Sequence, residues 1–496
     1  MRVKSPNDRI LFGLKVKQRR LKKNLSFAEL SQKTGISVSY LNEIEKGKKY
    51  PKKDKIEGLA EALDISASYL ISDDYDESIA PVAELLQSNF LNELPLDLFG
   101  IELSKVVEII ASAPARVGAF ISTLLELSRN YALREENFYF GALRSYLELH
   151  NNYFEDLEQK VLDFAVDHDL PKERPLPSEL LKQLLESKLG YKVLPTGLDD
   201  YPELKALRGV FLPNKKELLL PGHLTPIQRS FQYGKELAFD YLRMEQRAYT
   251  SSLLQTNNFE EVLNHSRAIY FSVALHMPLR MIERDMRQFF QMEKWDAQAF
   301  IDIMHKYDAT PEMYYHRLTN ILPSIFGIKK LFFLRISHDF TRDHFEIDRE
   351  LHLNHRHQPH GNGLEEHYCR RWIAISMLQE LRSKQLDGEE IGNKVEIQLS
   401  SYMATGDQYL VMTIGRSAYP SPNRNVGVSL GLLLDKHLKQ QIKFLKDTDI
   451  PTRMVHTTCE RCLISDCKVR AAEPVIINRR KKMAAIEEKI EALRKG

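Results

Sequence analysis

Apolar residues recur with a helical period in four consecutive segments of the first seventy residues. The first segment has an apolar side of Leu11, Leu14, Val16 and Leu21 and a polar side of Lys15, Lys17, Arg19, Arg20, Lys22 and Lys23. Ser26 and Glu29 show the S-x-x-E spacing of a capping box, which predicts the start of a second helix. Gly35 can supply the left-handed turn before a third helix, which Ser37 caps. The pattern predicts a small all-α head that contains a helix-turn-helix.

The hydrophobic pattern changes three times beyond this head. Residues 80–169 keep a helical period with few Gly or Pro, which predicts several amphipathic helices. Residues 178–243 alternate between helical stretches and short strand candidates. From Leu331 onward strand patterns dominate, and they include a hairpin with its turn at residues 405–407. This order predicts a multidomain protein that is mainly α, with an α+β C-terminal half.

Positive charge is concentrated near the N-terminal end of the sequence. The first 53 residues contain 15 Lys or Arg and four Asp or Glu, whereas the whole chain has a formal net charge of only +2. A basic head on a nearly neutral body indicates a nucleic-acid-binding module attached to something that controls it. No stretch approaches the roughly 20 apolar residues of a membrane span, and no secretory signal pattern is present. We therefore expect a cytoplasmic protein with no membrane partner.

The head contains two consecutive motifs, LSFAELSQKTGISVSYLNEIEKGKKYP and KIEGLAEALDIS. Over about Lys15 to Ile71 they resemble the lambda-repressor/Cro-like (XRE) helix-turn-helix family. The resemblance implies that the third helix enters the major groove of double-stranded DNA. Candidates for base contacts on its N-terminal part are Ser37, Val38, Ser39, Asn42 and Glu43. Candidates for phosphate contacts are Arg19, Arg20, Lys46, Lys48 and Lys49, although a solvated face is the alternative for the lysines.

A second family pattern lies in the middle of the chain. The order of elements over residues 180–322 resembles a zinc-peptidase-like domain that follows helix-turn-helix heads in some bacterial regulators. That family carries H-E-x-x-H, in which two histidines one helical turn apart hold zinc. Here Lys235 and Phe239 stand at the histidine positions, and Glu236 remains at the position of the general base. We expect a degenerate domain with no catalytic residues, and a regulatory protease is the disfavoured alternative.

All four cysteines lie in the C-terminal part of the chain. Cys459, Cys462 and Cys467 have the spacing C-x2-C-x4-C, and Cys369 lies 90 residues before the first of them. Three thiols within nine residues favour a soft metal site over disulfides in a cytoplasmic protein. A 4Fe-4S cluster is preferred slightly to zinc because the x4 gap departs from common zinc-finger pairs, and the role of Cys369 as fourth ligand is open. Reduced thiols packed in a turn are the alternative to a metal site.

Further motifs of the C-terminal part give a more specific resemblance. They are Cys369-Arg370-Arg371-Trp372, the hairpin GDQYLVMTIGRS and the ending CERCLISDCKVRAAEP. Together they resemble the short-chain fatty acyl transcriptional regulators, although Arg370 stands where that family has proline. The resemblance implies a regulator of propionate, acetate or glyoxylate metabolism that senses an acyl-CoA. Charge and a stacking face for CoA could come from Arg370, Arg371, Trp372 and Arg416, with surface ion pairs as the alternative for the first two.

These patterns divide the chain into five regions. They are an XRE-type head (1–72), a helical and dimerising region (79–170), a degenerate zinc-peptidase-like α+β domain (171–328), a cysteine-bearing sensor domain with a sheet (329–475) and a basic helical tail (476–496). We expect a homodimer that binds a pseudo-palindromic DNA operator and responds to an acyl-CoA. An iron–sulfur or thiol redox sensor is the alternative regulator.

Overall fold

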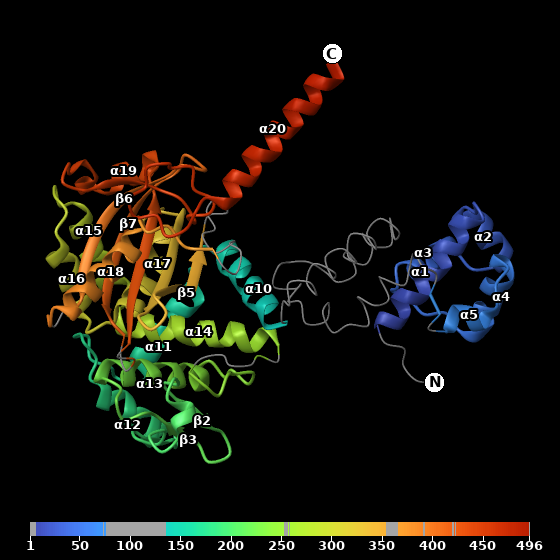
Figure 1. The fold of residues 1–496 in the computed structure, drawn as a ribbon. Coiled ribbons are helices and arrows are strands. Elements are labelled where there is room, and N and C mark those ends of the chain that lie inside the picture. The colour runs from blue at the N-terminus through green and yellow to red at the C-terminus, as the bar shows by residue number, and fades with distance from the viewer. Residues whose placement is uncertain are drawn as a thin grey trace. The chain divides into compact units, whose positions relative to one another are not determined.

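The computed structural model of the chain describes residues 6–72, 74–75, 135–251, 256, 258–353, 366–389, 392–418, 421 and 423–495. The chain divides into two compact units, one of residues 1–146 with 255–260 and one of residues 147–254 with 261–496 (Figure 1). The expected multidomain fold, with a helical head and a C-terminal half that contains sheets, is confirmed. The boundaries of the five regions stay predictions.

Five helices form the head: α1 (Pro6–Lys22), α2 (Phe27–Thr34), α3 (Val38–Glu45), α4 (Lys53–Leu63) and α5 (Ala67–Ile71). The capping box is confirmed, because Ser26 Oγ accepts from the Glu29 N–H and the Glu29 carboxylate accepts from the Ser26 N–H. Gly35 follows α2 with a left-handed φ of 66°, and Ser37 caps α3 by accepting from the Tyr40 N–H. Short-range signals in the sequence therefore fix the helix ends of the head.

The core of the head draws apolar residues from all five helices. Its buried members include Phe12, Val16, Leu30, Leu41, Ile44, Leu59, Leu63 and Leu70. The sequence pattern places Leu21 on the apolar side of α1, but this residue is 52% exposed. That expectation is wrong because the neighbouring Arg20 takes the buried position in the last turn of α1, where it pairs with Glu45.

Helical structure in the region 79–170 is confirmed for its second part. The helices there are α10 (Glu135–Leu149) and α11 (Glu155–Asp167). The helices expected between residues 79 and 134 lie outside the described residues.

A small sheet surrounded by helices follows the proline-rich segment 171–177. Its elements are α12 (Ser178–Leu189), β1 (Lys192–Leu194), the 3-10 helix η2 (Pro202–Leu204), β2 (Val210–Leu212), β3 (Glu217–Leu219), α13 (Pro226–Tyr241), α14 (Phe259–His276), α15 (Leu279–Phe290), α16 (Ala297–Lys306) and α17 (Pro311–Ile325). The strand order is β1-β3-β2, with β1 parallel and β2 antiparallel to β3. The expected α+β pattern of this domain is confirmed.

A six-stranded sheet forms the centre of the C-terminal part (Figure 1). Its elements and neighbours are β4 (Leu331–Asp339), β5 (His344–His352), α18 (Ile373–Leu386), β6 (Lys394–Tyr402), β7 (Gln408–Ser417), β8 (Arg424–Leu433), α19 (Lys436–Gln441), the 3-10 helix η3 (Lys443–Lys446) and β9 (Thr452–Val455). The order is β5-β4-β8-β7-β6-β9, and only β6 and β9 pair in parallel. The predicted β6–β7 hairpin is confirmed, with Gly406 at a left-handed φ of 73° in its turn.

Two hydrophobic cores lie on the two faces of this sheet. Helix α18 packs on one face through Met377, Leu378 and Leu381, while α17 packs against β4 and β8 on the other. The chain continues into the long helix α20 (Val475–Lys495), whose side chains are mostly exposed. Among the described residues, no helix combines the length and the apolar content that a membrane span requires.

Candidate functional site

The outer side of α3 presents the residues expected to contact DNA bases. Side chains are exposed at Ser37, Val38 and Ser39 and half-buried at Asn42 and Glu43. Leu41 and Ile44 are buried on the opposite side and anchor α3 to the core of the head. Val38 is 45% exposed, so its methyl groups are available to the methyl group of thymine. The Ser37 hydroxyl oxygen already accepts from the Tyr40 N–H, which leaves its O–H for other partners.

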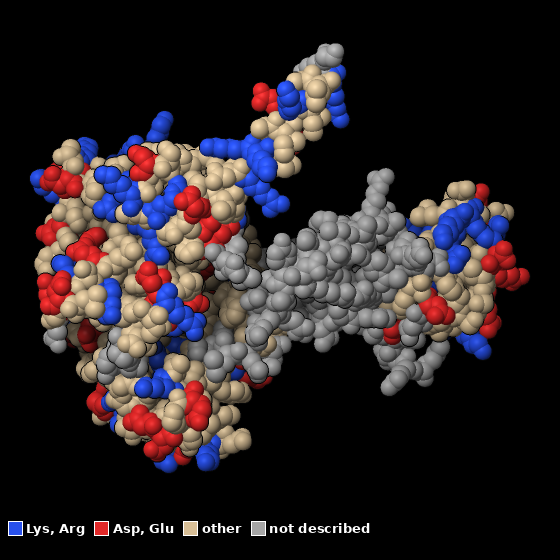
Figure 2. Space-filling view, in the orientation of Figure 1, with Lys and Arg blue, Asp and Glu red and all other residues tan. Residues whose placement is uncertain are grey.

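The basic residues expected to contact phosphates lie in different environments. Lys48 and Lys49 are exposed and Lys46 is half-buried in the turn after α3. Arg19 is half-buried, and its guanidinium lies 4.8 Å from the ring centre of Tyr69. Figure 2 shows acidic and basic side chains interspersed over the visible face of the larger unit. Because Lys48 and Lys49 are exposed whereas Arg19 is half-buried against Tyr69, these two lysines are the strongest phosphate candidates of the head.

Arg20 is a correction to the expected DNA-contacting set. It is 7% exposed, and its guanidinium donates to both carboxylate oxygens of Glu45 at 2.7 and 2.9 Å and to the Leu25 carbonyl at 2.9 Å. The same guanidinium lies 4.1 Å from the ring centre of Phe27. The expectation of a phosphate contact is wrong because these partners hold the side chain inside the head.

Lys15 also departs from the polar side of α1 on which its charge would place it. It is 1% exposed, and its Nζ donates to the carbonyls of Tyr69 and Ser72 at 2.8 and 2.6 Å. These bonds join α1 to the end of α5. The sequence contains a signal for this position, because Lys15 follows Leu11 by four residues and so shares the apolar face of the helix.

Helix α13 contains the residues that replace the zinc-binding motif. Arg247 Nη2 lies 2.6 Å from Glu236 Oε2, so the carboxylate at the general-base position is neutralised by an ion pair. The Arg247 guanidinium also lies 4.0 Å from the ring centre of Phe239, which is buried. Lys235 is 3% exposed, and burial together with Arg349 and Arg247 lowers its pKa to about 8 although Glu236 opposes the shift. A buried cation and an aromatic contact thus occupy the two ligand positions.

The four cysteines come from two segments, which the structure brings together. The Cys369 N–H donates to the Thr457 carbonyl at 3.1 Å, and the Cys459 N–H donates to the His367 carbonyl at 2.8 Å. Burial raises the pKa of the Cys369 thiol to about 11, and the Cys459 and Cys462 thiols lie close enough to contribute. Three of the four expected ligands are therefore neighbours.

The fourth cysteine and the loop around it complete this region. Cys467 is half-buried, whereas the other three are buried. Arg470 Nη1 donates to the Cys459 carbonyl at 2.9 Å, and the same guanidinium binds the Ile464 carbonyl, so it holds the loop in shape. Across the described part of the chain, no three His, Cys, Asp or Glu side chains are arranged to hold a metal ion. The four-cysteine site stays a prediction, and its soft thiol donors suit iron–sulfur or zinc.

The four residues expected to bind a CoA ligand do not lie together. The Arg370 guanidinium lies 4.4 Å from the ring centre of Phe345, on the α18 side of the sheet. The Arg371 carbonyl accepts from a glutamine side chain at 3.3 Å. Trp372 is 5% exposed and its Nε1 donates to a backbone carbonyl at 2.9 Å, so it offers no open stacking face and that expectation is wrong. Arg416 lies on the opposite side of the sheet, because residue 415 faces Met377 of α18 and neighbouring strand residues alternate.

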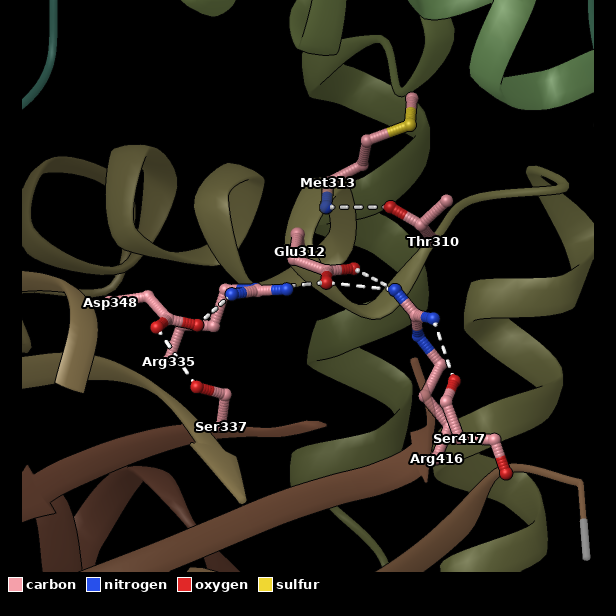
Figure 3. Close-up of polar contacts among 8 residues, drawn as sticks. All are labelled: Thr310, Glu312, Met313, Arg335, Ser337, Asp348, Arg416 and Ser417. Carbon is pink, nitrogen blue, oxygen red and sulfur yellow. Dashed lines mark hydrogen bonds and ion pairs between the residues drawn. The ribbon is translucent and has the colours of Figure 1, made fainter. Parts of the chain in front are cut away.

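Arg416 belongs to a group of charges that surrounds Glu312 in the first turn of α17 (Figure 3). Arg416 Nη2 lies 2.9 and 3.1 Å from the two carboxylate oxygens, and Arg335 Nε lies 3.3 Å from Oε1. Arg335 also pairs with Asp348, which accepts from Ser337 Oγ at 3.0 Å. Burial would raise the pKa of Glu312, but the Arg416 and Arg335 guanidiniums lower it to about 2. The sequence indicates this group of charges only through Arg335, a cation within the apolar run LFFLRIS.

Two family models match this chain, one in the head and one in the middle domain. Residues 16–70 match the helix-turn-helix family model, and residues 188–319 match the model of the IrrE N-terminal-like domain of the M78 peptidases. No curated protein matches the chain. A solved Mycobacterium tuberculosis transcriptional regulator is 18% identical, with 67% of this chain and 93% of that chain covered and a TM-score of 0.47.

The two family matches confirm the helix-turn-helix head and the peptidase-like middle domain. The match of the head to a helix-turn-helix model supports the interpretation of the protein as a DNA-binding regulator. Neither matched model reaches the C-terminal sheet, so the resemblance to the short-chain fatty acyl regulators stays a prediction.

Proposed function

We propose that the protein is a sequence-specific DNA-binding transcriptional regulator and that it has no enzymatic activity. The observation that supports this most strongly is the outer side of α3, where Val38, Ser39 and Asn42 are accessible. Lys48 and Lys49 follow directly and are exposed. With α3 in the major groove, the first group reads base edges and the second group binds phosphates.

Two variants of the full chain test this division. The preferred operator is selected from a random DNA library, and affinity is then measured over a range of salt concentrations. Asn42→Ala should cost about 1–3 kcal/mol on the preferred operator and little on other sequences. Lys48→Ala should weaken all sequences alike and reduce the salt slope by about 0.9. Lys436→Ala in α19 removes the same charge outside the head and should change neither quantity, and a protein that selects no sequence would refute the proposal.

Absence of peptidase activity is proposed from α13. Glu236 is held by Arg247, and Lys235 and Phe239 do not provide imidazole ligands for zinc. Incubation of the purified protein with zinc and unfolded substrate proteins should give no cleavage. Zinc-dependent cleavage that Glu236→Gln abolishes would establish the protease alternative.

We also propose that the regulator acts as a homodimer with two heads on half-sites about 34 Å apart. The helical region 79–170 is the expected dimer contact, and α20 adds a second one. Its apolar residues Met483, Ile486, Ile490 and Leu493 are exposed and spaced by three, four and three residues, as in a two-stranded coiled coil. Light scattering should give a dimer, and Ile490→Glu should shift it toward monomer, whereas Glu491→Lys should not.

The proposed effector is an acyl-CoA of short-chain fatty acid metabolism. A ligand that binds the folded state raises the melting temperature by mass action. Acetyl-CoA and propionyl-CoA are therefore compared with CoA and with buffer, using protein prepared anaerobically. A concentration-dependent shift that requires the acyl group supports this effector, and no shift with any CoA species excludes it.

We propose further that Cys369, Cys459, Cys462 and Cys467 hold a 4Fe-4S cluster or zinc. The closeness of the first three thiols supports a shared soft metal. Metal analysis and absorbance of anaerobically purified protein distinguish the two metals. Cys462→Ser should remove the metal. A loss of DNA affinity in proportion to the fraction of cluster oxidised would favour the redox-sensing alternative.

A further inference from the structure

The charges around Glu312 are not balanced. Four guanidiniums interact with this carboxylate, and they form the arginine cluster: Arg208, Arg335, Arg349 and Arg416. The acidic partners within the cluster are Glu312 and Asp348, so positive charge exceeds negative charge by two. Such an excess in one place is typical of a site for an anion.

Two members of the arginine cluster make no side-chain hydrogen bond to any residue that the structure describes. Arg335 and Arg416 bind Glu312, but neither the Arg208 nor the Arg349 guanidinium hydrogen-bonds another described residue. Partial burial lowers the pKa of both side chains. Arg208 is half-buried and Arg349 is exposed, so a dissolved molecule can reach them.

The sheet places two of these arginines in direct opposition. Arg335 on β4 is the register partner of Arg349 on β5, and the register shifts immediately after this pair. Like charges that face each other across two strands destabilise the sheet. An anion bound between the two guanidiniums would replace this repulsion with attraction.

Helix α13 contributes a further buried cation, Lys235. Lys235 is 3% exposed, and its ammonium makes no hydrogen bond or ion pair with another described residue. It interacts electrostatically with Arg349 and with Glu236, whose carboxylate is already paired with Arg247, and the buried His265 beside it brings no negative charge. A buried ammonium without a hydrogen-bonded partner is costly, and a bound anion would offset that cost.

We propose that the arginine cluster and Lys235 bind a phosphate group of a small molecule near Arg208 and Arg349. A planar guanidinium can bind phosphate through two parallel hydrogen bonds, and the lysine adds a point charge. A CoA ester, a nucleotide and free pyrophosphate share this chemistry. The anion can bind whether or not the head binds DNA, and only a regulatory effect of the anion on DNA binding would rest on the proposed function.

Binding would change the contacts of α17 with the sheet. A phosphate competes with Glu312 for Arg335 and Arg416, which are the residues that join α17 to β4 and β7. The matched peptidase-like domain ends within α17, at residue 319. The arginine cluster therefore lies where an anion can alter the connection between that domain and the C-terminal sheet, through its different affinity for the two arrangements.

The test is calorimetric titration of the full chain with pyrophosphate and with CoA at constant ionic strength. Saturable binding is expected, and Arg349→Gln and Arg208→Gln should each weaken it at least tenfold. Arg424→Gln removes a guanidinium of β8 that pairs with Asp339 outside the arginine cluster, and it should change affinity less than twofold. Glu312→Gln removes the competing carboxylate and should tighten binding several-fold, a result that a misfolded variant cannot give.

Each outcome decides the proposal. Absence of saturable binding by both probes refutes it, as does equal weakening by Arg424→Gln and Arg349→Gln. Binding of pyrophosphate but not CoA supports the anion site and excludes a CoA ester as its ligand. A protein that selects an operator but binds neither probe keeps its proposed function and loses this site. A protein that binds the probes through the arginine cluster but selects no operator keeps the site and loses the proposed function.

Discussion

Two groups of arginines involve α17, and their charges are arranged differently. Arg317 is completely buried, and its guanidinium donates to both carboxylate oxygens of Glu158 and to the Met277 carbonyl. The Tyr270 hydroxyl donates to the same carboxylate at 2.6 Å. The arginine cluster around Glu312, by contrast, has four guanidiniums for two carboxylates. A balanced pair with all its partners stabilises the fold, whereas an unbalanced group retains positive charge for a ligand.

The largest effect is expected from Arg317→Met. This change leaves the Glu158 carboxylate buried without its cation, which should lower the free energy of unfolding by about 3–5 kcal/mol. Urea unfolding can be followed by the fluorescence of Trp295 and Trp372, which both lie in the larger unit. Adding Glu158→Gln should recover much of the loss, because the buried charge is then removed. A double variant no more stable than the single one would show that Arg317 acts through packing and not through charge.

A second balanced pair, Arg20–Glu45, extends the comparison to the head. Arg20→Met should destabilise the head by about 3 kcal/mol for the same reason. Both tryptophans lie in the other unit, so hydrogen exchange of residues 6–72 is the appropriate measurement. Lys22→Met, which changes an exposed neighbour in α1, should have little effect. Unchanged exchange together with a reduced salt slope of DNA binding would restore Arg20 to the phosphate-contacting surface.

Acid should lower the free energy of unfolding by protonating Glu312, because its ion pairs with Arg335 and Arg416 are then lost. The Arg416 and Arg335 guanidiniums hold its folded pKa at about 2, below the ordinary value of 4.5. The resulting stability is present above about pH 4.5 and is lost as the pH falls toward 2. We expect a loss of roughly 2 kcal/mol after allowance for partial exposure of this side chain. Urea unfolding of the wild type and Glu312→Gln from pH 6 to pH 3 measures it, and identical pH profiles would contradict this role.

The sequence was sufficient for the elements of the head because the signals there are local. The capping box of Ser26 and Glu29 and the left-handed Gly35 lie within ten residues of one another, and each acts on its neighbours. Arg20 shows the limit of this reasoning. Its partner Glu45 lies 25 residues away, and only the packing of α1 against α3 reveals that the charge is buried.

The arginine cluster could not be predicted for the same physical reason. Arg416 was a ligand candidate from its place at the end of a hairpin, but its partner Glu312 is 104 residues away on a different element. In the strand β5, which contributes Arg349, polar and apolar residues alternate in the sequence, but the register shift opposite Arg335 changes the face on which its later residues lie. The zinc-motif positions could be judged from the sequence, because the loss of both histidines at Lys235 and Phe239 is a matter of residue type alone.

The smallest expected effect distinguishes Arg335 from Arg349, which are register partners on β4 and β5. Arg349→Met removes a cation without a hydrogen-bonded partner and relieves its repulsion with Arg335, so stability should be unchanged or higher by up to about 1 kcal/mol. Arg335→Met deprives Glu312 and Asp348 of a partner and should lower stability by about 1–3 kcal/mol. Urea unfolding of both variants without anion gives the sign of each change. If both variants lost the same stability, Arg349 would be a structural residue like Arg317, and the contrast between balanced and unbalanced arginines would not hold.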